Sequence, residues 1–276
     1  MENKEASSVL GNAATPYANQ LATQYASATH YYAIRHPSLP NYLALIGGDN
    51  FGVTSDCTTC FIQQDNLAAQ LEAKGRSWKA YMETMPTPCF VGNIQRYAQK
   101  HNPFIYCDNI RNDPARCHKI VPLSELDRDL QTNTLPDFVW ITPNLCNDTH
   151  DCPVATGDHW LLTWVPKLLA TAAWQQPGVL FITYDEGSSD QGCCQLAVGG
   201  QIMTLVISPL VQPGFVSHVP SDHYSLLRTI EVAWQLPLWG QANCDCSVPM
   251  TDFLVKPLGH SWPGGLNRSS NPYITA

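Results

Sequence analysis

Residues 179–186 read Val-Leu-Phe-Ile-Thr-Tyr-Asp-Glu, a run of apolar and β-branched side chains that ends in two adjacent acids. Continuous runs of this kind are typical of strands buried in a central parallel sheet. In open α/β sheets, ligands bind outside the carboxyl ends of the strands, where Asp185 and Glu186 come. Adjacent carboxylates at a buried strand end repel each other unless a cation or a shared proton neutralises them, so we expect a metal site there. The alternative is a pair of solvated carboxylates on a surface loop.

Short β-rich runs alternate with helical patterns along the rest of the chain. This alternation predicts an α/β fold with a mainly parallel central sheet sandwiched by helices. No linker or internal repeat divides the 276 residues, so we expect a single domain over 1–276, with an irregular C-terminal tail from about 257 to 276. We expect strands at 77–82, 138–142 and 202–207, and helices that begin at Asp65, Ser124, Asp158 and Ser221.

The composition excludes several classes of protein. Apolar residues make up 44% of the chain and charged residues 14%, which argues against a disordered chain or a coiled coil. Fifteen Lys and Arg against 23 Asp and Glu give a net charge of −8, without a basic run, so nucleic acid is not an expected partner. The longest apolar stretches fall far short of the roughly 20 residues that span a bilayer, and no transmembrane segment is expected.

Eleven cysteines indicate an oxidising compartment, because several of them lie close enough in sequence to form disulfides. A structural zinc site is the alternative, but Cys57-Thr-Thr-Cys60 has no second C-x-x-C partner at finger or ribbon spacing. The odd number leaves at least one thiol unpaired within the chain. We therefore expect a secreted or periplasmic protein, although no signal peptide follows Met1.

Ser38 lies in His36-Pro-Ser-Leu-Pro-Asn-Tyr42, directly before an expected helix start. Free backbone N–H groups at such a position favour developing negative charge, which suits a nucleophile that attacks phosphorus or a carbonyl carbon. The alternative is an ordinary helix N-cap beside a turn-forming proline.

His150 and His223 both lie in polar segments near expected strand ends or helix starts. Imidazole can hydrogen-bond phosphate oxygens or protonate a leaving group, whereas the plainer interpretation is an exposed histidine. Patterns typical of zincins, α/β-hydrolases and nucleotide-binding loops do not occur.

Five short motifs occur in order along most of the chain and together are specific. They are Glu2-Asn3-Lys4, Ser38-Leu-Pro-Asn41, Pro143-Asn-Leu-Cys-Asn-Asp-Thr-His150, Asp185-Glu-Gly187 and Asp222-His-Tyr-Ser-Leu-Leu-Arg-Thr-Ile-Glu231. In this order they resemble the bacterial phosphoesterases that include secreted acid phosphatases and phospholipases C, within the alkaline phosphatase superfamily.

The resemblance implies that Ser38 is a nucleophile that forms a phosphoserine intermediate. It implies that Asn41 donates to a phosphate oxygen and that His150 and His223 line the phosphate pocket, with His36 and His101 as further candidates. It also implies one divalent cation, held by the following ligands: Glu2, Asn3, the Ser38 oxygen, Asp185 and Glu186. An all-oxygen set favours calcium, magnesium or manganese over zinc.

The chain departs from this family at its beginning, because members have an apolar first strand that runs into the Glu-Asn pair. Here the pair follows Met1, so the first strand is expected to be missing, either through a start further upstream or through truncation. Terminal residues without a strand are usually mobile, and Glu2 and Asn3 are therefore expected to be poorly anchored.

The function expected from the resemblance is a metal-dependent phosphomonoesterase of the acid-phosphatase type. Its substrates would be small phosphate esters or a phospholipid head group. A phospholipase C-like phosphodiesterase is the first alternative, and an acyl hydrolase that uses Ser38 with a histidine is a weaker one. From another class, a cystine-rich secreted binding protein without catalysis remains open. The sequence leaves the oligomeric state undetermined.

Overall fold

The computed structural model describes residues 1–171, 174 and 178–254. The irregular tail expected at about 257–276 lies outside the described residues. Within them, no helix combines the length and the hydropathy that a bilayer-spanning helix needs.

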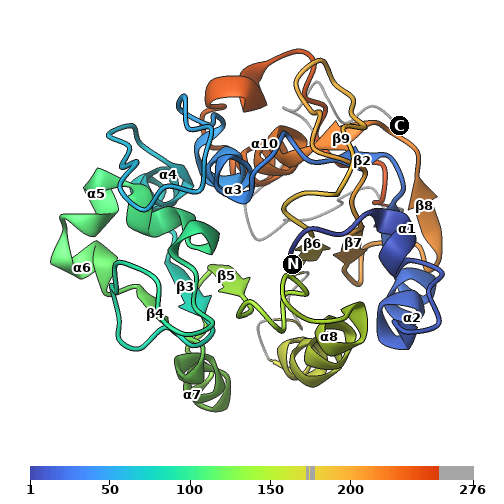
Figure 1. Cartoon of the computed structure of the whole chain (residues 1–276), viewed down its shortest axis with the longest axis horizontal. Coiled ribbons are helices and arrows are strands. Elements are labelled where there is room, and N and C mark those ends of the chain that lie inside the picture. Colours follow the sequence, from blue (N-terminus) through green and yellow to red (C-terminus); the bar gives the residue numbers. More distant parts are fainter. Residues whose placement is uncertain (172–173, 175–177, 255–276) are drawn as a thin grey trace.

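The strands form one parallel sheet, one mixed sheet and a short parallel pair (Figure 1). In the first, β3 (Trp78–Met82) pairs in parallel with both β4 (Ile120–Pro122) and β5 (Phe138–Thr142). The second has the order β6 (Leu180–Thr183), β7 (Thr204–Ile207), β1 (Ala26–Ala28) and β8 (Phe215–Ser217). In the third, β2 (Tyr31–Tyr32) pairs in parallel with β9 (Ser221–Asp222).

The expected mainly parallel α/β arrangement is confirmed, because four of these six strand pairs are parallel. The strand at 179–183 differs from its expectation, since β6 pairs with β7 in antiparallel register, Phe181 opposite Val206. Residues 184–203 connect the two strands without a helix. Parallel neighbours are usually joined through a helix, and this connection contains none, in keeping with the antiparallel pairing.

Helices lie above and below the strands in Figure 1. On one side, α3 (Ser38–Gly47) packs against α10 (His223–Trp234) and α4 (Leu67–Ala73). On the other, α8 (Val154–Leu169) packs against α2 (Pro16–Gln24). The remaining helices are α1 (Ala6–Val9), α5 (Asp108–Arg111), α6 (Pro114–Cys117) and α7 (Ser124–Thr132), with 3₁₀ turns η1 (Gln99–His101), η2 (Pro103–Tyr106) and η3 (Gly240–Asn243).

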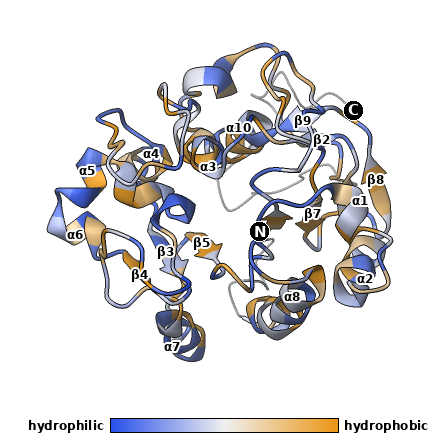
Figure 2. Cartoon of the chain, in the orientation of Figure 1, coloured by the Kyte–Doolittle hydropathy of each residue, from blue (hydrophilic) through white to orange (hydrophobic). Residues whose placement is uncertain are grey.

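The molecule has two main apolar cores, one around the sheet of β3, β4 and β5 and the other around the sheet of β1, β6, β7 and β8. One core gathers Leu39 and Leu43 of α3 with Trp78 of β3, and the other gathers Leu21 of α2 with Leu205 of β7. Figure 2 shows β5 and β7 in hydrophobic colours and α7 mainly in hydrophilic ones, as expected for a helix that buries one face. Trp140 of β5 packs against both cores.

Three helix starts differ from the expected ones. Helix α4 begins at Leu67, and its N-cap is Asn66 rather than Asp65. Helix α8 begins at Val154, and Asp158 lies within it, where its carboxylate accepts hydrogen bonds from the backbone N–H groups of Tyr17 and Ala18 at 3.0 and 2.7 Å. Asp158 therefore satisfies free donors at the N-terminus of α2 rather than those of its own helix. Helix α10 is capped by Asp222 through the N–H of Ser225 at 2.8 Å, while Ser221 lies in strand β9.

The N-terminal residues lie between the ends of β5 and β6 (Figure 1). The Met1 ammonium donates to the carbonyl of Thr183, and the N–H of Asp185 donates to the carbonyl of Met1. The N–H of Glu2 donates to the carbonyl of Asp148 at 2.7 Å, and Glu2 is fully buried. The expectation that Glu2 and Asn3 are poorly anchored is wrong, because backbone hydrogen bonds tie this segment to both flanking loops.

Ten of the eleven cysteines form disulfides, all of them local or between neighbouring elements. Cys107 is the remaining free thiol, and it is buried. The pairs are Cys57–Cys60, Cys89–Cys117, Cys146–Cys152, Cys193–Cys194 and Cys244–Cys246. The expectation of disulfides with one unpaired thiol is thus confirmed.

Candidate active site

Ser38 is the first residue of α3, and its side chain is buried. Its Oγ lies 3.2 Å from Oε2 of Glu2 and 3.2 Å from Oε1 of Glu186. The first comes from the N-terminal segment and the second from the loop after β6. Residues distant in sequence therefore converge on one hydroxyl at a helix N-terminus, where partial positive charge favours an anion.

Asn3 and Asp185 complete a cluster of oxygen atoms around Ser38. The backbone N–H of Asn3 donates to Oδ1 of Asp185 at 3.2 Å. One polar atom of the Asn3 amide lies 3.2 Å from Oε1 of Glu186 and from Oε2 of Glu2. As the amide nitrogen, this atom donates to both carboxylates. The structure thus brings together all five predicted metal ligands.

The carboxylates of this cluster lie close together and are buried. Burial, together with the charges of Glu2 and Glu186, raises the pKa of Asp185 well above its usual range. Oδ2 of Asp185 is buried without a hydrogen-bond partner among the described residues. Burial also raises the pKa of Glu186, although His36 opposes this effect. A divalent cation would neutralise these groups, and an all-oxygen donor set fits calcium, magnesium or manganese.

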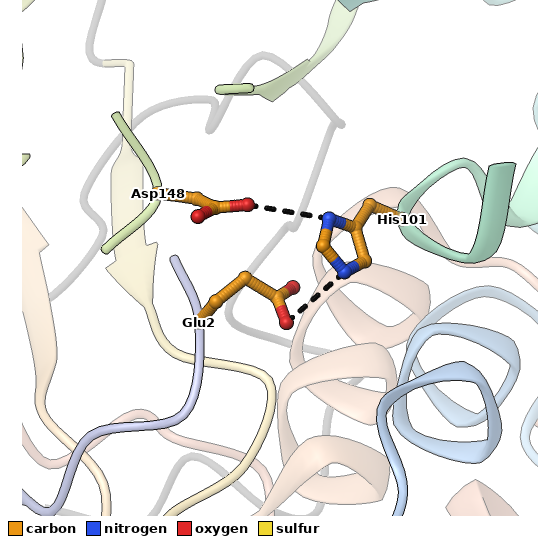
Figure 3. A group of neighbouring side chains, drawn as sticks. All are labelled: Glu2, His101 and Asp148. Carbon is orange, nitrogen blue, oxygen red and sulfur yellow. Dashed lines mark ion pairs between the residues drawn. The ribbon is translucent and has the colours of Figure 1, made fainter. Parts of the chain in front are cut away.

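His101 lies between two buried carboxylates (Figure 3). Its Nε2 is 3.1 Å from Oε2 of Glu2, and its Nδ1 is 3.2 Å from Oδ2 of Asp148. Burial alone would lower the pKa of His101, but the two carboxylates raise it, which favours the imidazolium form. The three groups also offer ligand atoms within 4.8 Å of one another, so a metal ion could take the place of the proton.

Burial alone would raise the pKa of Glu2, but the charge and hydrogen bond of His101 outweigh it and lower the pKa to about 2. His36 acts on the opposite side of the cluster, where its Nδ1 contacts Oε2 of Glu186 and its Nε2 lies 3.1 Å from the carbonyl of Ser189. The two further histidines named from the sequence thus each pair with a predicted metal ligand.

A residue that binds phosphate needs a free hydrogen-bond donor, whereas the polar side-chain atoms of Asn41 and His223 already have partners within the protein. Both are fully buried. Oδ1 of Asn41 accepts from the N–H groups of Ile34 and Arg35, and its Nδ2 donates to the carbonyls of Arg35 and Pro37. The amide of Asn41 thereby holds the turn that precedes Ser38.

Both ring nitrogens of His223 are also occupied by protein groups. Nδ1 lies 3.1 Å from the hydroxyl of Tyr31, and Nε2 lies 2.6 Å from the carbonyl of Asp185. Burial lowers the pKa of His223 to about 4, so the ring is neutral and Nε2–H donates to Asp185. In this arrangement, His223 holds the backbone of a predicted metal ligand.

His150 lies at the edge of the cluster. Its ring centroid is 6.1 Å from that of His101, and its Nδ1 lies 2.7 Å from Oδ1 of Asp151. Its backbone N–H donates to Oδ1 of Asp148. The side chain of His150 is 30% exposed and is therefore accessible from solvent.

Tyr42, Lys100 and Asp56 lie at or beside the site, and none of them had a role assigned from the sequence. Tyr42 donates its hydroxyl to Oε1 of Glu2 and stacks on His101. Lys100 donates from Nζ to Ser38 Oγ at 3.3 Å and to Oδ2 of Asp56 at 2.8 Å. A signal existed in the sequence, because Tyr42 is one residue beyond the Ser38–Asn41 motif and Lys100 directly precedes His101.

A separate cavity of about 570 Å³ opens beside helix α8. It is lined by Trp160 and Trp164 of the helix and by Glu83 and Asn147 from the loops after β3 and β5. None of the predicted catalytic or metal-binding residues lines it, although Asn147 is adjacent in sequence to Asp148. The cavity therefore lies next to the cluster rather than within it.

Solved structures share the fold that surrounds this site. A protein of the alkaline phosphatase superfamily from Vibrio parahaemolyticus aligns with a TM-score of 0.56 at 14% identity, covering 84% of this chain and 64% of that one. The structure of Ps i-CgsB aligns with a TM-score of 0.57 at 13% identity, covering 91% and 76%. The expected alkaline-phosphatase-like fold class is confirmed.

The chain belongs to the Phosphoesterase family, which it matches over residues 2–237. An acid phosphatase from Aspergillus fumigatus is 30% identical over 240 residues, which cover 83% of this chain and 52% of that protein. A phosphatidylinositol-3-phosphatase from Mycobacterium tuberculosis is 34% identical over 260 residues, which cover 91% and 79%. The chain thus spans about half the length of its fungal relative, and the family includes fungal as well as bacterial members.

Proposed function

We propose that this chain is a metal-dependent phosphomonoesterase in which Ser38 forms a phosphoserine intermediate. The observation that carries the proposal is the position of Ser38 Oγ, buried at a helix N-terminus and 3.2 Å from two carboxylates of a five-residue oxygen cluster. The names of the relatives support phosphate esters as substrates. The local disulfides support an oxidising location, secreted or periplasmic.

In the first half-reaction, Ser38 Oγ loses its proton to water and forms a bond to phosphorus while the bond to the substrate alcohol breaks. In the second, water attacks phosphorus, the bond to Oγ breaks, and Oγ regains a proton as inorganic phosphate leaves. Glu2, Asn3, Asp185 and Glu186 would hold the cation. When bound, the cation lowers the pKa of the Ser38 hydroxyl and offsets phosphate charge.

His150 is the better placed of the two predicted pocket histidines to protonate the leaving alcohol. Its Nδ1 pairs with Asp151, and its Nε2 has no hydrogen bond within the described part of the chain. His223 would act through Asp185, whose carbonyl accepts from its Nε2. Asn41 would act by holding the turn at Arg35 and Pro37 rather than by binding phosphate in the arrangement seen.

The test is hydrolysis of p-nitrophenyl phosphate and of bis-p-nitrophenyl phosphate, each measured with and without chelator. We expect monoester turnover in the parent, loss with chelator, recovery with calcium, magnesium or manganese, and loss in Ser38→Ala. Ser208→Ala is the matched control, because Ser208 is a buried serine whose hydroxyl donates to the carbonyl of Gly178.

Other outcomes would redirect the assignment. A preference for the diester would favour phospholipase C-like chemistry. Turnover that resists chelator, or that persists in Ser38→Ala, would overturn the proposed mechanism. No turnover of either ester at any pH, with metal bound, would favour a binding protein without catalysis.

A further inference from the structure

The ammonium group of Lys100 reaches the proposed nucleophile directly. Its Nζ lies 3.3 Å from Ser38 Oγ, and its side chain is 19% exposed. Among the described residues, Lys100 is the one ammonium group with a hydrogen bond to this hydroxyl. The other two groups hydrogen-bonded to Oγ, Glu2 and Glu186, are carboxylates and therefore disfavour negative charge on it.

Asp56 holds Lys100 in this position. Its Oδ2 accepts from Lys100 Nζ at 2.8 Å, while its Oδ1 accepts from the backbone N–H of Leu39 at 3.0 Å. Leu39 directly follows Ser38 in the first turn of α3. One carboxylate therefore connects the ammonium group to the helix that carries the nucleophile, which fixes the relative position of the two.

The loop that carries Asp56 is itself tied down. The disulfide Cys57–Cys60 closes it, the hydroxyl of Tyr106 donates to the carbonyl of Cys57, and Nε2 of Gln99 donates to the carbonyl of Thr58. Gln99 is adjacent to Lys100 in the same turn, η1. Such support for a charged pair is what a preorganised electrostatic group requires.

We propose that Lys100 is a catalytic residue that stabilises negative charge on Ser38 Oγ, and that Asp56 is its positioning residue. The inference rests on the proposed function, because it assigns Lys100 to the oxygen that attacks phosphorus. Lys100 keeps all its protons throughout. It donates a hydrogen bond to Oγ as the O–H bond breaks and the O–P bond forms, and again as the O–P bond to Oγ breaks during attack by water.

Because Oγ is the nucleophile in one half-reaction and the leaving group in the other, loss of Lys100 slows both. We expect Lys100→Met to lower kcat/KM about 100-fold, as removal of one preorganised donor does in other enzymes. The loss should be similar for p-nitrophenyl phosphate, phenyl phosphate and an alkyl phosphate, since Lys100 does not act on the substrate's leaving group.

The matched control is Lys79→Met. Lys79 forms an ion pair with Asp129 at 2.5 Å, its side chain is 20% exposed, and it lies on β3 outside the site. This variant removes a comparable ion pair and should retain activity. Circular dichroism and thermal unfolding, measured on both variants, show whether Lys100→Met is folded.

Two further variants separate chemistry from structure. In Lys100→Ala, added ethylammonium chloride should restore part of the activity, whereas equal sodium chloride should not, because only the amine replaces the missing donor. Asp56→Asn keeps an oxygen acceptor for the N–H of Leu39 but removes the charge that holds Lys100. We expect it to lower kcat about tenfold with little change in unfolding temperature.

The outcomes distinguish this inference from the proposed function. If Ser38→Ala is inactive while folded Lys100→Met keeps activity near the parent's, the role of Lys100 is wrong and the phosphoserine proposal stands. A loss confined to poor leaving groups would place Lys100 at the substrate alcohol and overturn the assignment to Oγ. Full activity in Ser38→Ala would remove the basis for both.

Discussion

The hydroxyl of Tyr42 donates a hydrogen bond to Oε1 of Glu2, and the Tyr42 ring stacks on His101 with centroids 5.4 Å apart. Burial and the charge of Glu2 raise the pKa of Tyr42 well above its usual range, so the group is a donor at any relevant pH. Helix α3 thus supplies both the proposed nucleophile and a side chain that orients the carboxylate of Glu2, a proposed metal ligand.

Tyr42→Phe is expected to weaken metal binding and activity. The change retains the ring on His101 but leaves Oε1 of Glu2 without its donor, at a cost of about 1–3 kcal/mol for a buried charged acceptor. We expect a higher metal concentration for half-maximal activity, measured by titrating metal into chelator-treated protein. Tyr81→Phe is the matched control, because its hydroxyl donates to Asp129 at 2.6 Å away from the site. An equal metal requirement in both variants would contradict the role of Tyr42.

Asp185→Asn is expected to separate stability from metal binding. Without metal, the variant removes a carboxyl group whose ionisation is disfavoured by burial and by the charges of Glu2 and Glu186, so its unfolding temperature should exceed that of metal-free parent by several degrees. With calcium, magnesium or manganese, the parent should gain stability and the variant should gain little, because a ligand is missing. Thermal unfolding with chelator and with each metal tests both statements.

Asp190→Asn is the control for that experiment, since the Asp190 side chain is 96% exposed. It should follow the parent under both conditions. If Asp185→Asn were less stable than the parent in chelator, the carboxylate would be stabilising the metal-free fold, contrary to this account.

Glu231 is expected to make folding stability depend on pH between 4.5 and about 7. It is buried on α10, where Nε2 of Gln70 donates to Oε1 and Oε2 has no hydrogen-bond partner among the described residues. Burial raises its pKa from 4.5 to about 7, although Gln70, Trp239 and Arg228 oppose this. The folded state holds this proton more tightly than the unfolded state, so its contribution to stability falls as pH rises from 4.5 to 7.

Glu231→Gln should abolish that dependence, because glutamine can keep the acceptor for Gln70 and carries no charge. The variant should match the parent at pH 4.5 and exceed its free energy of unfolding above pH 7 by up to about 3 kcal/mol, at 1.36 kcal/mol per pKa unit. Urea unfolding from pH 4.5 to 8 measures this difference. Glu125→Gln on α7 is the surface control, and a variant no more stable than the parent at pH 8 would refute the prediction.

When the protein is unfolded in the absence of reductant, Cys107 is expected to be the one cysteine that an alkylating reagent modifies. It is buried, and burial raises its pKa to about 12, so iodoacetamide should leave the native protein unmodified. Unfolded, non-reduced protein should gain a single label, which peptide mass mapping would place at Cys107. Labels at other cysteines would show that a disulfide of the structure is absent in solution.

Much of the site follows from local sequence. The acid pair Asp185-Glu186 ends an apolar strand, and Ser38 begins a helix after a proline, so strand-end and helix-start rules identify both. Each pattern alone fits a surface loop or an ordinary helix cap. Their order along the chain, rather than any single spacing, is what indicated a phosphoesterase.

Other features were decided by the tertiary structure, because they depend on groups far apart in sequence. Asp158 has the local pattern of a helix start, yet its carboxylate satisfies the free N–H groups of Tyr17 and Ala18 some 140 positions away. Strand β6 has the composition of a parallel strand, but it pairs with β7 in the antiparallel direction.

The sequence by itself determined the α/β class, the disulfide-rich character and the residue types of the oxygen cluster, since these depend on composition, local periodicity and neighbouring motifs. Only the tertiary structure decided that Glu2 is anchored between two loops, that Lys100 reaches Ser38, and that the amide of Asn41 and the ring of His223 are already hydrogen-bonded. The physical reason is that hydrogen bonds form between atoms near each other in space, and sequence spacing does not specify which distant donors and acceptors will meet.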